Sequence, residues 1–244
     1  SKEPQYIPIA LGLLGASGAD LPLTLRGGSA VEGVVVLDQW EQEFVFEGVE
    51  EKPAPSMLRG FSAPVKLRME QPFEDLLHLL AHDADEFNRW EAAQRIFKKL
   101  ILARLAGGGG PAVPDDVISA LHNVLKDSSL DKAMAAMTIT MPGENEIAGF
   151  VEGPADPGAI HSVRVEVGEA IARGLRADLE ATVAANEDTG PYSPDHASAA
   201  RRTLKNTCLA YLAKLGDSQV HAGLLPRCLE AANMTDQLAA LSAL

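Results

Sequence analysis

The stretch Phe61–His82, FSAPVKLRMEQPFEDLLHLLAH, contains the point at which the sequence changes from one structural period to another. Up to Met69 it continues a series of short β-prone runs. After Gln71 the composition changes to Ala, Leu, Glu, Arg and Lys with apolar residues at helical spacing, and this pattern lasts to the end of the chain. We therefore expect two domains, an all-β domain over residues 1–70 and an all-α domain over residues 71–244.

The β half contains five β-prone runs separated by turn residues: YIPIALGLL, LPLTL, VVVL, EFVFEGV and FSAPVKLRM. Residues 43–49 alternate polar and apolar side chains, which is typical of a strand with one buried face. The spacing favours an immunoglobulin-like β-sandwich, but that fold needs about seven strands. We therefore expect an incomplete sandwich, with the missing strands upstream.

The strongest helical pattern runs from Asp85 to Ala106, and we expect Trp90 to be buried in its apolar stripe. A glycine run and Pro111 end this helix. Six further helical segments are predicted: 115–125, 130–138, 145–150, 157–186, 196–215 and 219–232. Short polar loops between them indicate a curved α-solenoid. Residues 235–244 begin with an N-cap but have no C-cap, so we expect the solenoid to be truncated there.

Composition excludes several functional classes. The chain has 244 residues, 46% of them hydrophobic, and a formal net charge of −13. Nucleic acids and anionic membranes require a basic face, so neither is expected as a partner. No run approaches the ~18 apolar residues of a membrane helix, and the N-terminal sequence has no apolar signal core. Cys208 and Cys228 lie in no C-x-x-C pattern, which favours reduced thiols in a cytoplasmic protein, with a disulfide between them as the alternative.

A pair of histidines four residues apart, His78 and His82, has the spacing that zinc peptidases use in H-E-x-x-H. On a helical wheel they fall with Glu74 on one face, opposite an apolar face. The apolar face consists of Phe73, Leu76, Leu77 and Leu80. The residue after His78 is a leucine, so the general base of an H-E-x-x-H helix is absent. We interpret both histidines as solvent-facing.

Other candidate groups also favour structural interpretations. His122, His161, His196 and His221 occur singly. Arg201, Arg202 and Lys205 form a basic patch that we interpret as a salt-bridged or solvated face. The glycines at 107–110 follow no strand and precede no Gly-Lys-Ser/Thr, so they are not a phosphate loop. The residues alone therefore predict no catalytic, cofactor-binding or metal-ligating position in this chain.

Four segments carry a resemblance to a known family. They are Pro55–Leu67 (PSMLRGFSAPVKL), His82–Gln94 (HDADEFNRWEAAQ), Arg201–Asn206 (RRTLKN) and Ala232–Asp236 (ANMTD). These segments resemble the bacterial alanyl aminopeptidase (aminopeptidase N) family of zinc exopeptidases, in the part that follows the catalytic domain. They are long, ordered and distributed over nearly the whole chain.

The resemblance implies a parent protein of four domains, of which this chain covers the small β-sandwich and the first part of the C-terminal helical domain. The family's H-E-x-x-H helix, its third zinc ligand and its G-A-M-E-N motif have no counterpart here. The resemblance therefore implies zinc in the parent but no cofactor in this chain, and no catalytic residue carries over. It also implies that the partners are the parent's own catalytic domain and short peptides, in a monomeric cytoplasmic protein.

Three functional hypotheses follow. The preferred one is a non-catalytic fragment of a zinc aminopeptidase, acting as spacer and chamber wall. The second is an independent sandwich-plus-solenoid adaptor that binds a peptide or protein on its concave face. The third is a metal hydrolase that uses the stripe of Glu74, His78 and His82.

Overall fold

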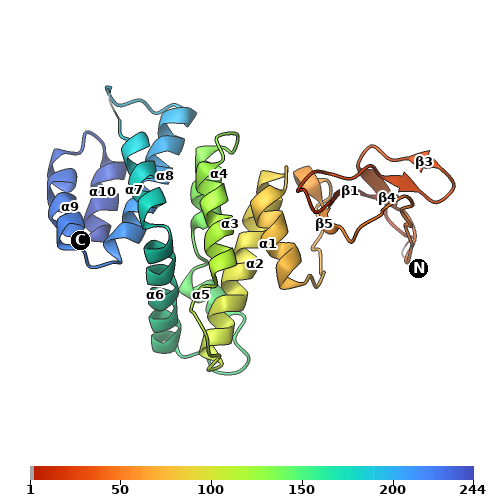
Figure 1. Ribbon diagram of the computed structural model, residues 1–244, viewed down its shortest axis with the longest axis horizontal. Coiled ribbons are helices and arrows are strands. Elements are labelled where there is room, and N and C mark those ends of the chain that lie inside the picture. Colours follow the sequence, from red (N-terminus) through yellow and green to blue (C-terminus); the bar gives the residue numbers. More distant parts are fainter. Residues whose placement is uncertain (1–2, 189) are drawn as a thin grey trace. The chain divides into compact units, whose positions relative to one another are not determined.

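The computed structural model describes residues 3–188 and 190–244 (Figure 1). The chain divides into two compact units, Ser1–Ala93 and Gln94–Leu244. All five described strands lie in the first unit and precede ten α-helices, so the expected order of β before α is confirmed. The division between the units falls inside helix α2 (Glu86–Leu105). Helix α1 (Phe73–His82) belongs to the first unit, where it packs on β5. The domain boundary expected at residue 70 stays a prediction.

The larger sheet has β1 (Ile7–Leu14) as its central strand, in the order β4-β1-β5. The first half of β1, residues 7–10, pairs antiparallel with β4 (Val34–Leu37). The second half, residues 11–14, pairs antiparallel with β5 (Ala54–Met57). The long strand therefore links two short ones that pair with different halves of it.

A second, two-stranded sheet joins β2 (Thr24–Leu25) and β3 (Ser29–Ala30). The strand expected at residues 43–49 does not form and contributes only an isolated bridge between Leu25 and Phe46. Gly48 has a φ of 74°, which turns the chain out of the extended conformation directly after this bridge.

The strand expected in FSAPVKLRM is also absent, and β5 lies before this run rather than within it. Phe61 has a φ of 54°, and it ends the short 3-10 helix η1 (Arg59–Phe61). Pro64 has no N–H to donate to a neighbouring strand. The left-handed residue and the proline together prevent this run from joining the sheet.

A buried ionic contact links β5 to the end of α1. Arg59 donates through Nη2 to Asp83 Oδ1 at 2.9 Å and through both terminal nitrogens to Asp20 at 2.7 and 2.8 Å. The Asp83 side chain is fully buried, and burial raises its pKa although the charge of Arg59 opposes this. The guanidinium crosses β1 at Gly12, where a Cβ would lie 2.2 Å from Arg59 Cζ. Only glycine leaves room for this crossing.

Residues at the start of α2 also form hydrogen bonds to the segment that contains Arg59. Asp85 Oδ2 accepts a hydrogen bond from the backbone N–H of Gly60 at 2.8 Å. Asn88 Nδ2 donates to Ser56 Oγ at 2.7 Å and to the Met57 carbonyl at 3.1 Å. We call this network, from Asp20, Ser56–Phe61 and Asp83–Asn88, the Arg59 joint. It stabilises the left-handed conformation of Leu58 and Phe61, which costs about 1–3 kcal/mol per residue.

Helix α1 buries Leu76, Leu79 and Leu80. The expected apolar face included Leu77 and placed His78 opposite it. The buried face is rotated toward Leu79, and His78 is half-buried as a result. The helical wheel missed this rotation because it contains no information about which side of α1 the strands cover.

On helix α2, Ile96, Phe97 and Ile101 are fully buried, whereas Trp90 is only half-buried. The expectation of a buried Trp90 is therefore wrong. Trp90 instead stacks at the edge of the Arg59 joint, with its ring 5.1 Å from that of Phe87. Phe87 in turn lies 4.1 Å from the ring of Phe61.

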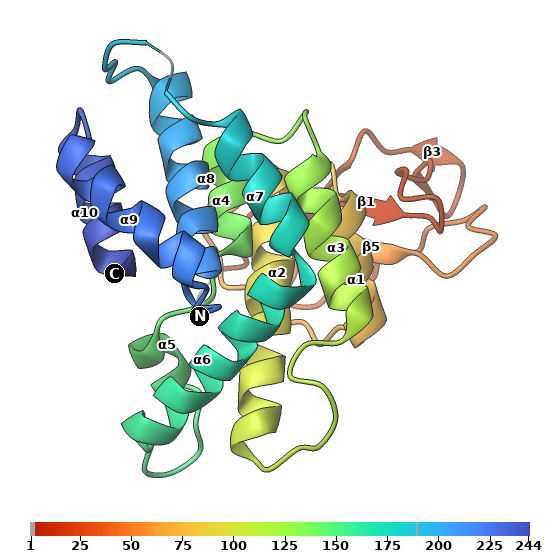
Figure 2. The same cartoon turned by 60° about the vertical axis from the view of Figure 1, so that its left-hand side comes forward.

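The second unit contains eight further helices among the described residues (Figure 2). They are α3 (Asp115–Lys126), α4 (Lys132–Ile139), α5 (Glu144–Ala148), α6 (Pro157–Gly174), α7 (Arg176–Ala185), α8 (His196–Ala213), α9 (Ser218–Glu230) and α10 (Met234–Ala243). The single helix expected over residues 157–186 breaks at Leu175. Gly174 precedes the break, and a Cβ there would lie 2.8 Å from Ile118 Cδ1.

Helix α8 is the centre of the second unit. It packs against α4, α6, α7, α9 and α10, and Figure 2 shows α7 and α4 beside it. Its buried apolar side chains include Leu204, Cys208 and Leu212, which recur at steps of four. None of the helices among the described residues is long and apolar enough to cross a bilayer.

We predict that Phe97→Ala lowers the free energy of unfolding by about 3–5 kcal/mol, the range for large aromatic residues in full burial. Trp90→Ala is the matched variant on the same helix, and it should cost clearly less because its ring is partly in water. Urea unfolding followed by circular dichroism measures both. Equal losses for the two variants would contradict the burial assigned to this helix.

Candidate functional site

The histidine pair does not form a metal site. His78 Nε2 lies 2.7 Å from the carbonyl oxygen of Gly15, and a carbonyl only accepts, so this nitrogen carries the proton and is unavailable as a ligand. His82 packs against Gly18, and burial together with the charge of His78 lowers the pKa of His82. The interpretation of His78 as solvent-facing is wrong, because its ring fixes the turn after β1.

No other metal centre is present in residues 3–188 and 190–244, where no three His, Cys, Asp or Glu side chains are close enough to hold an ion. The two cysteines are free and buried. Burial raises the pKa of Cys208 to about 12, so this thiol is protonated at neutral pH and is a poor nucleophile.

The basic patch on α8 is neutralised within the chain. Arg202 is 4% exposed and pairs with Asp188, and Lys205 is 4% exposed and pairs with Asp236 Oδ2 at 3.0 Å and with Glu187. Burial alone would raise the pKa of Asp236, but hydrogen bonds led by that from Asn233 outweigh it and lower the pKa. The interpretation of this patch as salt-bridged is confirmed, and Arg201 also pairs with Asp188. Arg202 and Lys205 are buried, whereas Arg201 is partly exposed.

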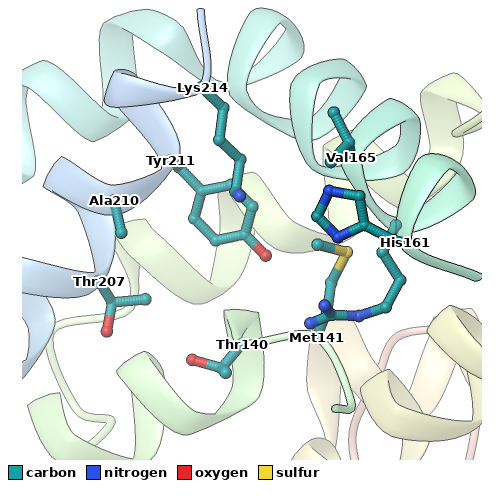
Figure 3. Close-up of a pocket in the computed structure, with 9 residues that line it drawn as sticks. Thr140, Met141, His161, Val165, Thr207, Ala210, Tyr211 and Lys214 are labelled. Atoms are coloured by element: carbon teal, nitrogen blue, oxygen red, sulfur yellow. The ribbon is translucent and has the colours of Figure 1, made fainter. Parts of the chain in front are cut away.

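A pocket of about 290 Å³ lies between α6, α8 and the residues that follow α4 (Figure 3). We call it the α6–α8 pocket. It is lined by Thr140, Met141, His161, Arg164, Val165, Thr207, Ala210, Tyr211 and Lys214. Figure 3 shows the side chains of Lys214, Tyr211, His161 and Met141 around one common space.

Two lining residues are held in place by hydrogen bonds to the backbone. The Tyr211 hydroxyl donates to the carbonyl of Ile139 at 2.5 Å, and burial raises its pKa, so it stays neutral. Arg164 Nε donates to the carbonyl of Pro142 at 2.9 Å. The first bond fixes α8 to the last residue of α4, and the second fixes α6 to the segment that follows α4, so the pocket has a defined shape.

One carboxylate outside the lining is shared by two of the basic side chains. Glu144 accepts from His161 Nδ1 at 2.9 Å and from Arg164 Nη1 at 3.3 Å. The hydrogen bond from His161 lowers the pKa of Glu144, so this carboxylate is ionised at neutral pH.

The pocket was missed from the sequence, where His161 counted as a single, scattered histidine. A signal was nevertheless present, because residues 161, 164 and 165 share one face of a helix, as do residues 207, 210, 211 and 214. Nothing in the sequence indicates that these two faces meet, since α6 and α8 are separated by α7.

Two domain families match nearly the whole chain. A family described as "Domain of unknown function (DUF3458) Ig-like fold" matches residues 1–70. A second, described as "Domain of unknown function (DUF3458_C) ARM repeats", matches residues 73–244. The expected fold class, an immunoglobulin-like domain followed by a helical-repeat domain, is thereby confirmed.

Curated relatives share sequence over almost all of this chain. Aminopeptidase N of Escherichia coli (strain K12) is 39% identical over 99% of the chain, and that of Caulobacter vibrioides is 36% identical over 95%. The chain spans 28% and 26% of these relatives. A crystal structure of Legionella pneumophila aminopeptidase A in complex with aspartic acid has a TM-score of 0.80 and 30% identity, over 98% of this chain and 28% of that one.

These similarities agree with the resemblance found in the sequence motifs. Two of those motifs, Pro55–Leu67 and His82–Gln94, contribute all the residues of the Arg59 joint except Asp20. The chain therefore belongs to the DUF3458_C family of ARM repeats, here preceded by a DUF3458 Ig-like domain, and it is a homologue of aminopeptidase N.

Proposed function

We propose that the chain is the non-catalytic C-terminal portion of a zinc-dependent aminopeptidase, in which it serves as a spacer and as part of the wall of a chamber over the catalytic domain. One observation carries the proposal: nearly all of the chain matches little more than a quarter of aminopeptidase N. The zinc ligands and the catalytic groups then belong to the parent's catalytic domain.

A helical wall suits an exopeptidase physically. Such a wall excludes folded proteins, admits short peptides and keeps bulk water from the reacting centre. The second unit supports this role because α8 packs against five other helices around buried apolar side chains. The parent is proposed to be a monomeric cytoplasmic enzyme that removes N-terminal residues from short peptides.

Exposed apolar side chains on the first unit offer a surface for the catalytic domain. Tyr6 and Trp40 are 79% and 74% exposed, and Val34 and Val36 on β4 also face solvent. Aromatic side chains of this size are enriched in the buried centre of protein interfaces.

The last two helices carry a second such surface. Its members are Leu225, Leu229, Met234, Leu238, Leu241 and Leu244, each at least half exposed. Further helical repeats of the parent would cover this face, since each repeat in a solenoid buries its apolar side against the next.

We predict that the 244-residue chain binds no stoichiometric zinc and hydrolyses no aminoacyl anilide. The reason is that His78 Nε2 is engaged by the Gly15 carbonyl and no third ligand lies nearby among the described residues. Metal analysis after dialysis against zinc provides the measurement, with His122→Ala as a matched histidine variant. One tightly held ion per chain that is lost in His78→Ala but kept in His122→Ala would contradict the prediction.

A second prediction compares this chain with the full protein by amide hydrogen exchange. Amides of β4 and α10 should exchange more slowly in the full protein, because its other domains would cover their apolar faces. Amides in the buried middle of α8 serve as the internal control and should exchange equally. Equal exchange in β4 and α10 as well would instead favour an independent adaptor.

A further inference from the structure

The α6–α8 pocket is opposite in charge to the chain that contains it. His161, Arg164 and Lys214 are basic, and none of the described lining residues is acidic. The whole chain, in contrast, has 34 acidic and 21 basic residues. A basic pocket in an acidic protein gathers small anions from solution, because the local potential there is positive.

Lys214 is the side chain that is most available to a ligand. It forms no ion pair within residues 3–188 and 190–244, and it is exposed. Its stem crosses α6 at Gly168, where a Cβ would lie 3.0 Å from Lys214 Cδ and 3.1 Å from Met141 Cε. A glycine inside a helix costs about 1 kcal/mol relative to alanine. At this position it lets the lysine and the methionine approach α6.

Arg164 presents a fixed guanidinium to the same space. Its Nε is engaged by the Pro142 carbonyl and its Nη1 by Glu144, while Nη2 has no partner in the described part of the chain. The planar fork of an arginine matches the two oxygens of a carboxylate. Among the described residues, Glu144 is the one carboxylate paired with both His161 and Arg164, so the basic side chains around the pocket outnumber the acidic ones.

The remaining walls determine what else the ligand must contain. Met141, Val165 and Ala210 contribute apolar surface, and the Thr207 hydroxyl has no hydrogen-bond partner among the described residues. The volume of about 290 Å³ lies at the lower end of ligand pockets, which span roughly 300–1,000 Å³. An inorganic ion would leave the apolar walls uncovered, whereas a small amphipathic molecule would cover them.

We propose that the α6–α8 pocket binds a small organic carboxylate that bears an apolar side chain. In this proposal Lys214 and the free Nη2 of Arg164 contact the carboxylate, and Met141 and Ala210 contact the apolar part. The pocket is formed within the second unit alone, so binding does not depend on the proposed aminopeptidase parent.

N-acetyl-L-leucine is a suitable probe, because its blocked amino group leaves the carboxylate as its one charge. Its neutral counterpart, N-acetyl-L-leucinamide, has the same apolar side chain. We expect saturable shifts of the Thr207 and Ala210 amide resonances on titration of the 244-residue chain with the acid, and none with the amide. Equal shifts with both compounds, or shifts that do not saturate, would overturn the proposal.

Three variants locate the site. Lys214→Met should weaken binding of the acid about tenfold or more, the scale of a lost charge-assisted hydrogen bond. Ala210→Phe should abolish binding by filling the apolar wall, with the charges left in place. Lys99→Met removes an exposed lysine from α2 and should leave binding unchanged. Unchanged affinity in both pocket variants, with circular dichroism spectra like that of the unmodified chain, would contradict the assignment.

Competition with inorganic phosphate tests whether the pocket recognises the apolar part of the ligand as well as its negative charge. We expect phosphate to compete with N-acetyl-L-leucine only at concentrations at least about tenfold higher, because it covers none of the apolar wall. If phosphate competes at equal concentration, the pocket recognises an anion only, and the proposed class of ligand is wrong.

Discussion

The contact between Arg59 and the fully buried carboxylate of Asp83 constrains everything else in the first unit. A buried carboxylate without a cation is strongly destabilising, so the end of α1 must lie where the guanidinium reaches it. That requirement fixes Arg59 across β1, and it explains Gly12, whose missing side chain leaves the path open. It also explains the left-handed backbone at Leu58 and Phe61, which turns the chain from β5 toward the helices.

The sequence predicted the features that depend on the local spacing of apolar residues. It did not predict the features that depend on how distant elements pack together. The change of period near residue 70 predicted β before α. The basic patch with Arg202 and Lys205 was interpreted as a salt-bridged or solvated face, and the structure shows it salt-bridged. The burial of Trp90 and the exposure of His78 were wrong, because both depend on which side of a helix the rest of the unit covers. The α6–α8 pocket could not be predicted, because it forms where two helix faces that are far apart in the chain come into contact.

In the second unit, three faces of helix α8 have three different roles. The face of α8 with Leu204, Cys208 and Leu212 forms the apolar core. A second face carries Arg202 and Lys205, which form ion pairs with Asp188 and Asp236. A third face, ending at Lys214, lines a pocket whose positive charge is neutralised only in part, by Glu144, among the described residues. A wall for a peptidase chamber and a binding pocket of its own are therefore compatible in one unit.

The most direct measurement is a double-mutant cycle on Arg59→Met and Asp83→Asn, with the free energy of unfolding as the readout. If the Arg59 joint organises the first unit, the two residues should be coupled by about 2 kcal/mol, within the range of 0.5–3 kcal/mol for residues in one network. The double variant would then be much less destabilised than the sum of the single variants. Additivity to within about 0.3 kcal/mol would contradict the central role of this contact.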